Sequence, residues 1–363
     1  MSTSSSRSLA ERVLGKTAAE VARDVGVPRE AVELAWSAEI VDLHVESFIP
    51  ARLYRYDLHR RHSHLFPLGG FLFGHLDLPR VLGGGLTGAM WSIATNITRS
   101  SSRRSGVLAE NVADLRRTLE KSPHVGIART HADWARLRAE GKHAALVTVQ
   151  GGNAFESPKL RGGSFENPEG LVTRVTVVHL SSSVLGATSS PARGRGDAGL
   201  SDLGREFVRW LDAERIFVDL AHASPKSFWD AVEVHDRSRP LIVTHTGISE
   251  VRPMWRNIDA RQVKAVADSG GVVGIIFHRG FLGPGDGRRV IDHVEAAIAA
   301  GGEDCAALGS DYDGFIVPPA DLRDGGAGFY RLVAYMLERK WNETRIRKVL
   351  GANFVQSFAR LRP

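Results

Sequence analysis

Five short apolar runs in this chain end in histidine or aspartate, the side chains that hold metals and move protons. The runs cover residues 40–44, 174–179, 216–222, 241–245 and 306–311, and they end in His44, His179, His222, His245 and Asp311. A buried strand that finishes on such a residue presents it at the carboxyl edge of a sheet, where α/β barrels build their active sites. A lone histidine in an apolar run is more often a core residue, but the same placement on five strands indicates a site.

The first run carries a second candidate ligand. Asp42, His44 and Glu46 alternate, so in a strand all three can line one face at the mouth of a barrel. A histidine and a carboxylate two residues apart can bind one divalent metal, although a surface pair has the same spacing. His222 and His245 end separate strands and, taken with His44, are predicted to be metal ligands. Asp311 could orient or deprotonate a metal-bound water.

Two further residues have candidate roles beside such a metal. His179 could donate a hydrogen bond to the oxyanion of a tetrahedral intermediate, or it could lie near the metal without a catalytic task. Arg256 follows the sixth predicted strand and could clamp a substrate carboxylate with two parallel hydrogen bonds. The alternative for Arg256 is an ordinary surface arginine.

Strands and helices alternate along the chain in a way that explains how these residues could meet. Strand-like runs are predicted at 38–44, 86–93, 143–150, 174–179, 216–222, 241–245, 271–278 and 305–311. Helices are predicted between them at 107–121, 131–141, 202–214, 224–236, 259–269 and 288–300. Eight strands that alternate with helices favour a closed (β/α)8 barrel, also called a TIM barrel, with its strands parallel and its helices outside.

The remaining segments are assigned around that barrel. Residues 1–37 are predicted to form an N-terminal helical extension, in which residues 17–20 resemble a capping box, and residues 38–363 form a single barrel domain. The barrel domain ends in helices over 327–340 and 343–350 and a short final piece. Loops rich in Gly and Ser at 96–106, 151–170 and 180–200 each follow a strand, so they should shape the substrate pocket.

Composition narrows the class of protein. The chain has 363 residues and a net charge of +6, and its basic residues are scattered rather than gathered with stacking aromatics, so we expect no nucleic-acid partner. No apolar run is long enough to span a membrane and no secretory signal is recognisable, so no membrane partner is expected. The single cysteine, Cys305, suits a reducing compartment, and we expect a cytoplasmic protein.

The order of these segments resembles the membrane (renal-type) dipeptidases, peptidase family M19 of the amidohydrolase superfamily. The resemblance runs from about residue 40 to residue 358 and rests on the order and spacing of several modest motifs. They lie at residues 78–92, 141–152, 199–222, 308–314 and 350–354. The resemblance implies a (β/α)8 barrel that binds two zinc ions and cleaves dipeptides, or in some members β-lactams, by attack of a metal-bound hydroxide.

The resemblance also implies roles for individual residues. His44 and the residue two beyond it would hold one metal, and His222 and His245 would hold the other. Asp311 would be the proton shuttle, His179 would stabilise the oxyanion, and Arg256 would bind the carboxylate of a small substrate. By analogy with the family the protein would be a homodimer.

Two positions depart from the family pattern. The first strand has Glu46 where the family has aspartate, a change that keeps the charge. The third strand has Gln150 where the family has a glutamate that bridges both metals. A neutral amide is a poor bridging ligand, so Gln150 makes the second zinc ion doubtful. His75 and Asp77 have the family's His-x-Asp form, but no apolar strand precedes them, so we reject them as the ligand pair.

Three functions fit this pattern. The first is a metal-dependent hydrolase of a dipeptide or related amide C–N bond. The second is a divergent amidohydrolase with another reaction in a specialised pathway, which the altered ligands and long loops would suit. The third is a catalytically impaired descendant with an incomplete metal site, which Gln150 favours. A fold and a set of remnant ligands do not by themselves choose among them.

Overall fold

Nine strands of apolar and β-branched residues form one parallel sheet in the computed structural model, which describes all residues except 1–7, 63–70, 96–99, 157–164 and 192–197. The strands are β1 (Val41–Val45), β2 (Gly88–Ala94), β3 (Val125–Ile127), β4 (His143–Gln150), β5 (Val172–Thr176), β6 (Phe217–Asp219), β7 (Val243–Thr246), β8 (Val273–Ile275) and β9 (Ala306–Leu308). Nearly every strand residue is buried, as expected for a parallel sheet with both faces covered.

Eight of these strands curl into a nearly closed barrel. Their order is β6-β5-β4-β2-β1-β9-β8-β7, and an isolated parallel bridge between Asp219 and Ile242 joins the two ends. The predicted (β/α)8 barrel and its eight strands are therefore confirmed. The ninth strand, β3, pairs with β4 at His143–Ala145, below the point where β5 begins to pair at Val147. Strand β3 has only three residues, too few to give an alternating or continuous apolar pattern, so the sequence did not predict it.

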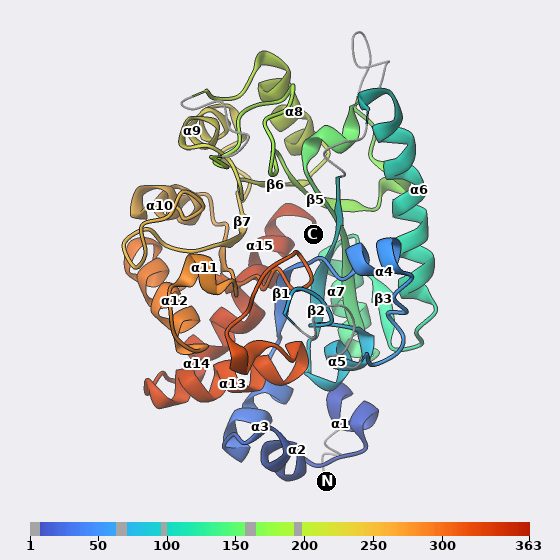
Figure 1. Cartoon of the computed structure of the whole chain (residues 1–363), viewed down its shortest axis with the longest axis vertical. Helices are drawn as coiled ribbons and strands as arrows, with labels where there is room; N and C mark the ends of the chain where they lie inside the picture. The colour runs from blue at the N-terminus through green and yellow to red at the C-terminus, as the bar shows by residue number, and fades with distance from the viewer. Residues whose placement is uncertain (1–7, 63–70, 96–99, 157–164, 192–197) are drawn as a thin grey trace.

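Helices surround the barrel (Figure 1). Those outside the N-terminal segment are α4 (Phe48–Tyr54), α5 (Leu78–Gly83), α6 (Ser101–Glu120), α7 (His131–Ala139), α8 (Asp202–Ala213), α9 (Pro225–Val234), α10 (Ala260–Asp268), α11 (Arg279–Leu282), α12 (Arg288–Gly301), α13 (Gly325–Glu338), α14 (Glu343–Arg347) and α15 (Asn353–Leu361). All six predicted inter-strand helices are present. A π-helical turn over Lys348–Ala352 joins α14 to α15, so the final piece is a third C-terminal helix.

The prediction of a loop over 96–106 is wrong in part. Helix α6 begins at Ser101, whereas residues 96–99 lie outside the described residues. The serine and arginine run at 101–105 has no apolar stripe, and Ser102 and Arg103 are exposed. The other two predicted loops each contain segments outside the described residues, at 157–164 and 192–197.

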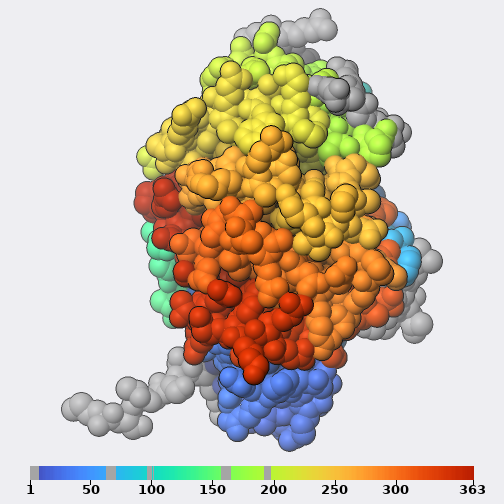
Figure 2. Space-filling model, turned by 90° about the vertical axis from the view of Figure 1, so that its left-hand side faces the viewer, coloured from blue at the N-terminus to red at the C-terminus, as the bar shows by residue number. Residues whose placement is uncertain are grey.

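Three N-terminal helices pack on the outside of the barrel, at the lower end of the molecule in Figure 1. They are α1 (Leu9–Leu14), α2 (Ala18–Val25) and α3 (Arg29–Ser37), and α2 begins with the capping box formed by Thr17 and Glu20. Trp36 donates its indole N–H to Tyr330 Oη at 2.7 Å, and that hydroxyl donates to the Gly83 carbonyl at 2.6 Å. Figure 2 shows the same segment, in blue, against the red surface of the C-terminal helices.

Across the residues that the structure describes, no helix combines the length and the apolar character needed to cross a bilayer.

Candidate active site

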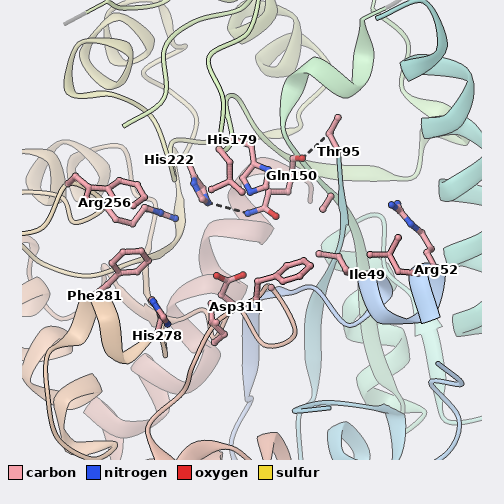
Figure 3. Close-up of a pocket in the computed structure, with 17 residues that line it drawn as sticks. Ile49, Arg52, Thr95, Gln150, His179, His222, Arg256, His278, Phe281 and Asp311 are labelled. Atoms are coloured by element: carbon pink, nitrogen blue, oxygen red, sulfur yellow. Dashed lines mark hydrogen bonds between the residues drawn. The ribbon is translucent and has the colours of Figure 1, made fainter. Parts of the chain in front are cut away.

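The barrel brings the predicted site residues to one edge of the sheet. His44 lies in β1, Gln150 ends β4 and His245 lies in β7. His179, His222 and Asp311 each follow the last residue of β5, β6 or β9 by three positions. Figure 3 shows the side chains of His179, His222, Gln150 and Asp311 turned toward a common space.

One group of donors gathers around His44. Its Nε2 lies 3.0 Å from Glu46 Oε1 and 3.6 Å from Asp311 Oδ1, and all three side chains are buried. The His44 ring stacks on the His245 ring with centroids 3.9 Å apart. Ligand atoms of His44, His245 and Asp311 all lie within 4.8 Å of one another. Imidazole nitrogens and carboxylate oxygens at such separations can share one metal ion.

A second group gathers around His245. His222 Nε2 and His245 Nε2 are 2.9 Å apart. The amide nitrogen of Gln150 lies 3.2 Å from His222 Nε2 and 3.3 Å from His245 Nε2. An amide N–H can only donate, so in this orientation Gln150 competes for the lone pairs that a metal would need. A metal held by His222 and His245 requires the Gln150 side chain to turn and offer its carbonyl oxygen.

Backbone strain accompanies several of these side chains. His222 has φ 65° and Asp311 has φ 62°, in the left-handed region that non-glycine residues seldom adopt. Gly151, directly after Gln150, has φ 101°, and a Cβ there would lie 2.8 Å from Asn153 Oδ1. Strain of this kind persists where the surroundings fix the chain, and it is concentrated at functional sites.

Sequence reasoning missed Asp219, which orients His245. The carboxylate of Asp219 accepts from the Thr244 hydroxyl at 2.7 Å, so the Thr244 oxygen is left to accept from His245 Nδ1 at 2.8 Å. The proton of neutral His245 is therefore on Nδ1, and the Nε2 lone pair faces the site, as a metal ligand requires. The available signal was an aspartate within the apolar run that leads to His222.

Arg174 was also missed, and it acts on His44. Its Nη2 lies 2.7 Å from His44 Nδ1, and all of its side chain is buried. Arginine can only donate, so Nδ1 of His44 accepts and the proton of neutral His44 is on Nε2, directed at Glu46. To bind a metal through Nε2, a neutral His44 must carry its proton on Nδ1 instead, and it then no longer accepts from Arg174. A charged residue inside the apolar run 172–178 was the signal.

The protonation states suit a metal site. Burial lowers the pKa of His44, His222 and His245 well below the usual 6.5, so these imidazoles are neutral. Burial, assisted by the charge of Glu46, raises the pKa of Asp311 well above its usual value. A buried carboxyl whose pKa is raised holds a proton more readily than an ordinary aspartate does.

Arg256 and His179 line the same pocket. Arg256 is buried rather than on the surface, and its Nη2 donates to the His245 carbonyl at 2.6 Å. Burial lowers the Arg256 pKa to about 10, so the guanidinium remains charged at neutral pH. The ring of His179 meets that of His222 edge-on with centroids 4.7 Å apart, and burial lowers the His179 pKa to about 3. His179 is thus a neutral hydrogen-bonding group.

His75 and Asp77 have structural partners. Asp77 caps the start of α5 and pairs with Arg80, and His75 Nδ1 accepts from the Asp313 backbone N–H at 3.3 Å. Asp313 is also fully buried, and its carboxylate accepts from the Ser47 hydroxyl and from the backbone N–H groups of His75 and Leu76.

The donors fit a divalent cation. Apart from their mutual contact at 3.0 Å, His44 Nε2 and the oxygens of Glu46 are buried without a well-formed hydrogen bond among the described residues. Buried polar atoms without partners are costly, and a metal would satisfy them. The residues that could hold it are His44, Glu46, His222, His245 and Asp311.

Two of these donors, His222 and Asp311, line a pocket of about 590 Å³. In Figure 3, Arg256, Phe281 and His278 lie on one side, and Ile49 and Arg52, from α4, lie on the other. A volume of this size is ordinary for a small-molecule site.

Comparison with known proteins adds the following. A family model described as membrane dipeptidase (peptidase family M19) matches residues 29–361. An uncharacterized protein in the pqqA 5' region of Klebsiella pneumoniae is 33% identical over 166 residues, which are 44% of this chain. The match spans 59% of that relative's length.

Two solved structures share the fold. A metallo peptidase from Rhodobacter sphaeroides, liganded with a phosphinate mimic of the dipeptide L-Ala-D-Ala, is 23% identical with a TM-score of 0.75, over 89% of this chain and 99% of that one. The probable dipeptidase PvdM from Pseudomonas aeruginosa is 16% identical with a TM-score of 0.74, over 93% of this chain and 98% of that one.

Proposed function

Because the chain belongs to the membrane dipeptidase family, peptidase family M19, we propose that it is a metal-dependent hydrolase of a dipeptide or related amide C–N bond. The single observation that carries the proposal is the meeting of His44, His245 and Asp311 within 4.8 Å at the carboxyl edge of the barrel. The Rhodobacter neighbour, liganded with a dipeptide mimic, supports a substrate of that size.

We propose zinc as the metal. Three neutral imidazoles, from His44, His222 and His245, and the carboxylate of Glu46 make the nitrogen and oxygen donor set that zinc takes. Bound there, zinc would lower the pKa of a water and polarise the scissile carbonyl.

Three side chains around the metal would have separate roles in the reaction. Asp311, with its raised pKa, accepts a proton from the attacking water and passes it to the leaving amine. His179, neutral and turned into the pocket, donates to the oxygen that becomes negative as the carbonyl is attacked. Arg256, fixed by the His245 carbonyl, binds the free carboxylate of the substrate.

Gln150 favours one tightly held metal over two. Its amide nitrogen contacts both His222 and His245, and it adds no negative charge to offset a second dication. The same contacts favour a second candidate, a descendant whose metal site is impaired.

Zinc content and turnover distinguish these functions. We expect protein purified without chelator to contain zinc and to cleave some members of a panel of small amides with a free carboxylate. A protein that takes up no zinc and remains inert after zinc loading would contradict the proposal and favour the impaired descendant.

Arg256 has its own test. We expect Arg256→Ala to lower kcat/KM for a substrate with a free carboxylate by roughly 100-fold, because a charge-assisted bidentate contact is lost. The same variant should change little for the matching carboxamide, which offers Arg256 no charge. Equal losses on both substrates would show that Arg256 does not bind the carboxylate.

Location and assembly remain predictions. A cytoplasmic location is consistent with the buried free thiol of Cys305, and cell fractionation would test it. The homodimer rests on family analogy alone, and sedimentation analysis would test it.

A further inference from the structure

Large apolar side chains that face solvent are concentrated at the mouth of the pocket. Leu53, Leu180, Trp255 and Phe315 are 57, 43, 39 and 54% exposed, and all four line the pocket. They are half of the eight exposed large apolar side chains in the described part of the chain. Apolar groups left in water around one cavity indicate a surface that a ligand covers.

The charged side chains that line the pocket are mostly positive. Arg256 lies on one wall and Arg52 on the opposite wall (Figure 3). Among the described residues that line the pocket, Asp311 is the only carboxylate, and its Oδ1 is 3.6 Å from His44 Nε2, within the metal-binding group. Gln150, at the floor, adds a neutral amide. No acidic side chain there is free to receive a cationic group.

The amino-terminal end of a free dipeptide is poorly matched to this pocket. With its carboxylate on Arg256, its α-ammonium points to the opposite wall, which α4 forms with Ile49, Arg52 and Leu53. There the ammonium would lose water and gain no counter-charge from the described residues that line the pocket. An uncharged apolar group at the same place would instead cover Leu53, Leu180 and Phe315.

We propose that the substrate is an N-acyl amino acid, in which a bulky, uncharged, apolar acyl group replaces the amino-terminal residue of a dipeptide. This inference rests on the proposed function and narrows its substrate class. In the reaction, a water oxygen bonds to the acyl carbon and the C–N bond breaks. The acyl group leaves as a carboxylic acid, and the nitrogen of the amino acid takes a proton from the water.

A matched pair of substrates tests the proposal. Leucyl-alanine and 4-methylpentanoyl-alanine differ only in the α-amino group. With zinc-loaded protein we expect kcat/KM for 4-methylpentanoyl-alanine to exceed that for leucyl-alanine by about tenfold or more. Acetyl-alanine, which lacks the apolar chain, should also be slower by about tenfold. Equal or faster cleavage of leucyl-alanine would overturn the inference.

Variants test the apolar contact and the effect of charge separately. Leu180→Ser should reduce the preference for 4-methylpentanoyl over acetyl, whereas Val184→Ser, at a residue that is 53% exposed but does not line the pocket, should leave it unchanged. Arg52→Glu should shift the preference toward leucyl-alanine, and Arg55→Glu, the same charge change just after α4, should not. An unchanged preference in Leu180→Ser and Arg52→Glu would contradict the proposed contacts.

A binding measurement separates this inference from the proposed function. Phosphinate mimics of the two matched substrates, titrated calorimetrically into zinc-loaded protein, should differ in Kd by about tenfold in favour of the mimic without the amino group. If neither amide is cleaved, the proposed hydrolysis is wrong, and the two mimics still decide the inference. Equal Kd values, or tighter binding of the mimic with the amino group, would overturn it.

Discussion

In the proposed function, Gln150 is the residue that limits the number of metal ions in the site. Its amide nitrogen contacts the two histidines that would hold a second ion, and its neutrality leaves the charge of that ion unbalanced. A carboxylate at the same position would accept rather than donate and would add one negative charge.

We therefore expect Gln150→Glu to raise the zinc content from about one to about two ions per chain. Gln150→Met removes the amide without adding charge and serves as the control that stays near one. Metal analysis after dialysis against a zinc buffer measures both. Two ions per chain already in the natural protein would show that the amide does not block the second position.

The residues that touch the predicted metal could be found from the sequence, but the residues that hold them could not. His179, His222, His245 and Asp311 follow β-branched apolar runs, and that pattern alone places them at strand ends. Arg174 and Asp219 lie inside such runs, where a charged residue argues against burial. The folded structure explains why these two charged residues are buried, because Arg174 contacts His44 from β1 and Asp219 contacts Thr244 from β7.

At the scale of elements, the segment from Asp311 to Phe315, which begins with the proposed proton-transfer residue, has a strained backbone. Asp311, Asp313 and Phe315 have φ of 62°, 66° and 61°, and each such residue costs about 1 kcal/mol or more. The buried carboxylate of Asp313 accepts three hydrogen bonds, from Ser47, His75 and Leu76, that fix the segment against the barrel.

We expect Asp313→Asn to lower the free energy of unfolding by about 2–3 kcal/mol, because an amide N–H would replace an acceptor that faces three donors. Urea unfolding measures this loss. Asp304→Asn is the control, since that side chain is 73% exposed, and it should change stability little. Wild-type stability in Asp313→Asn would show that the three hydrogen bonds do not fix the segment.

The sequence predicted elements well where periodicity was long and poorly where it was short. The strands of the barrel and six helices follow clear apolar runs, whereas β3 has three residues and the first turn of α6 has no apolar stripe. The Asp-Gly pair at 313–314 predicted a turn, and the turn is present. Its buried carboxylate could not be anticipated, because its partners come from segments more than 230 positions away.

At the scale of the whole molecule, buried neutral histidines make stability depend on pH. His143 begins β4, at the opposite end of that strand from Gln150, and is fully buried. Its Nδ1 faces the Leu86 carbonyl at 2.8 Å, and its Nε2 accepts from the Trp91 indole at 3.2 Å. Burial lowers the His143 pKa from 6.5 to about 4.

The lowered pKa of His143 fixes the direction in which stability changes with pH. The unfolded chain binds a proton at His143 below pH 6.5, whereas the folded chain resists it until about pH 4, so stability is full above pH 6.5 and falls as the pH drops. We expect His143→Gln to remove roughly 2 kcal/mol of the stability difference between pH 7.5 and pH 5. Urea unfolding in chelator at both pH values measures it. An unchanged difference would mean that His143 is not the titrating group.

The joint between β6 and β7 is one of the sparsest in the barrel, and it lies beside the candidate site. β2 and β4 share seven paired residues, whereas β6 and β7 are joined by the single bridge from Asp219 to Ile242. His222 lies just beyond one side of this joint and His245 lies on the other. A metal ion bound by both histidines would cross-link β6 and β7. We therefore expect metal affinity and the rigidity of the barrel to be coupled. Removing the metal would then loosen the protein's framework as well as its active site.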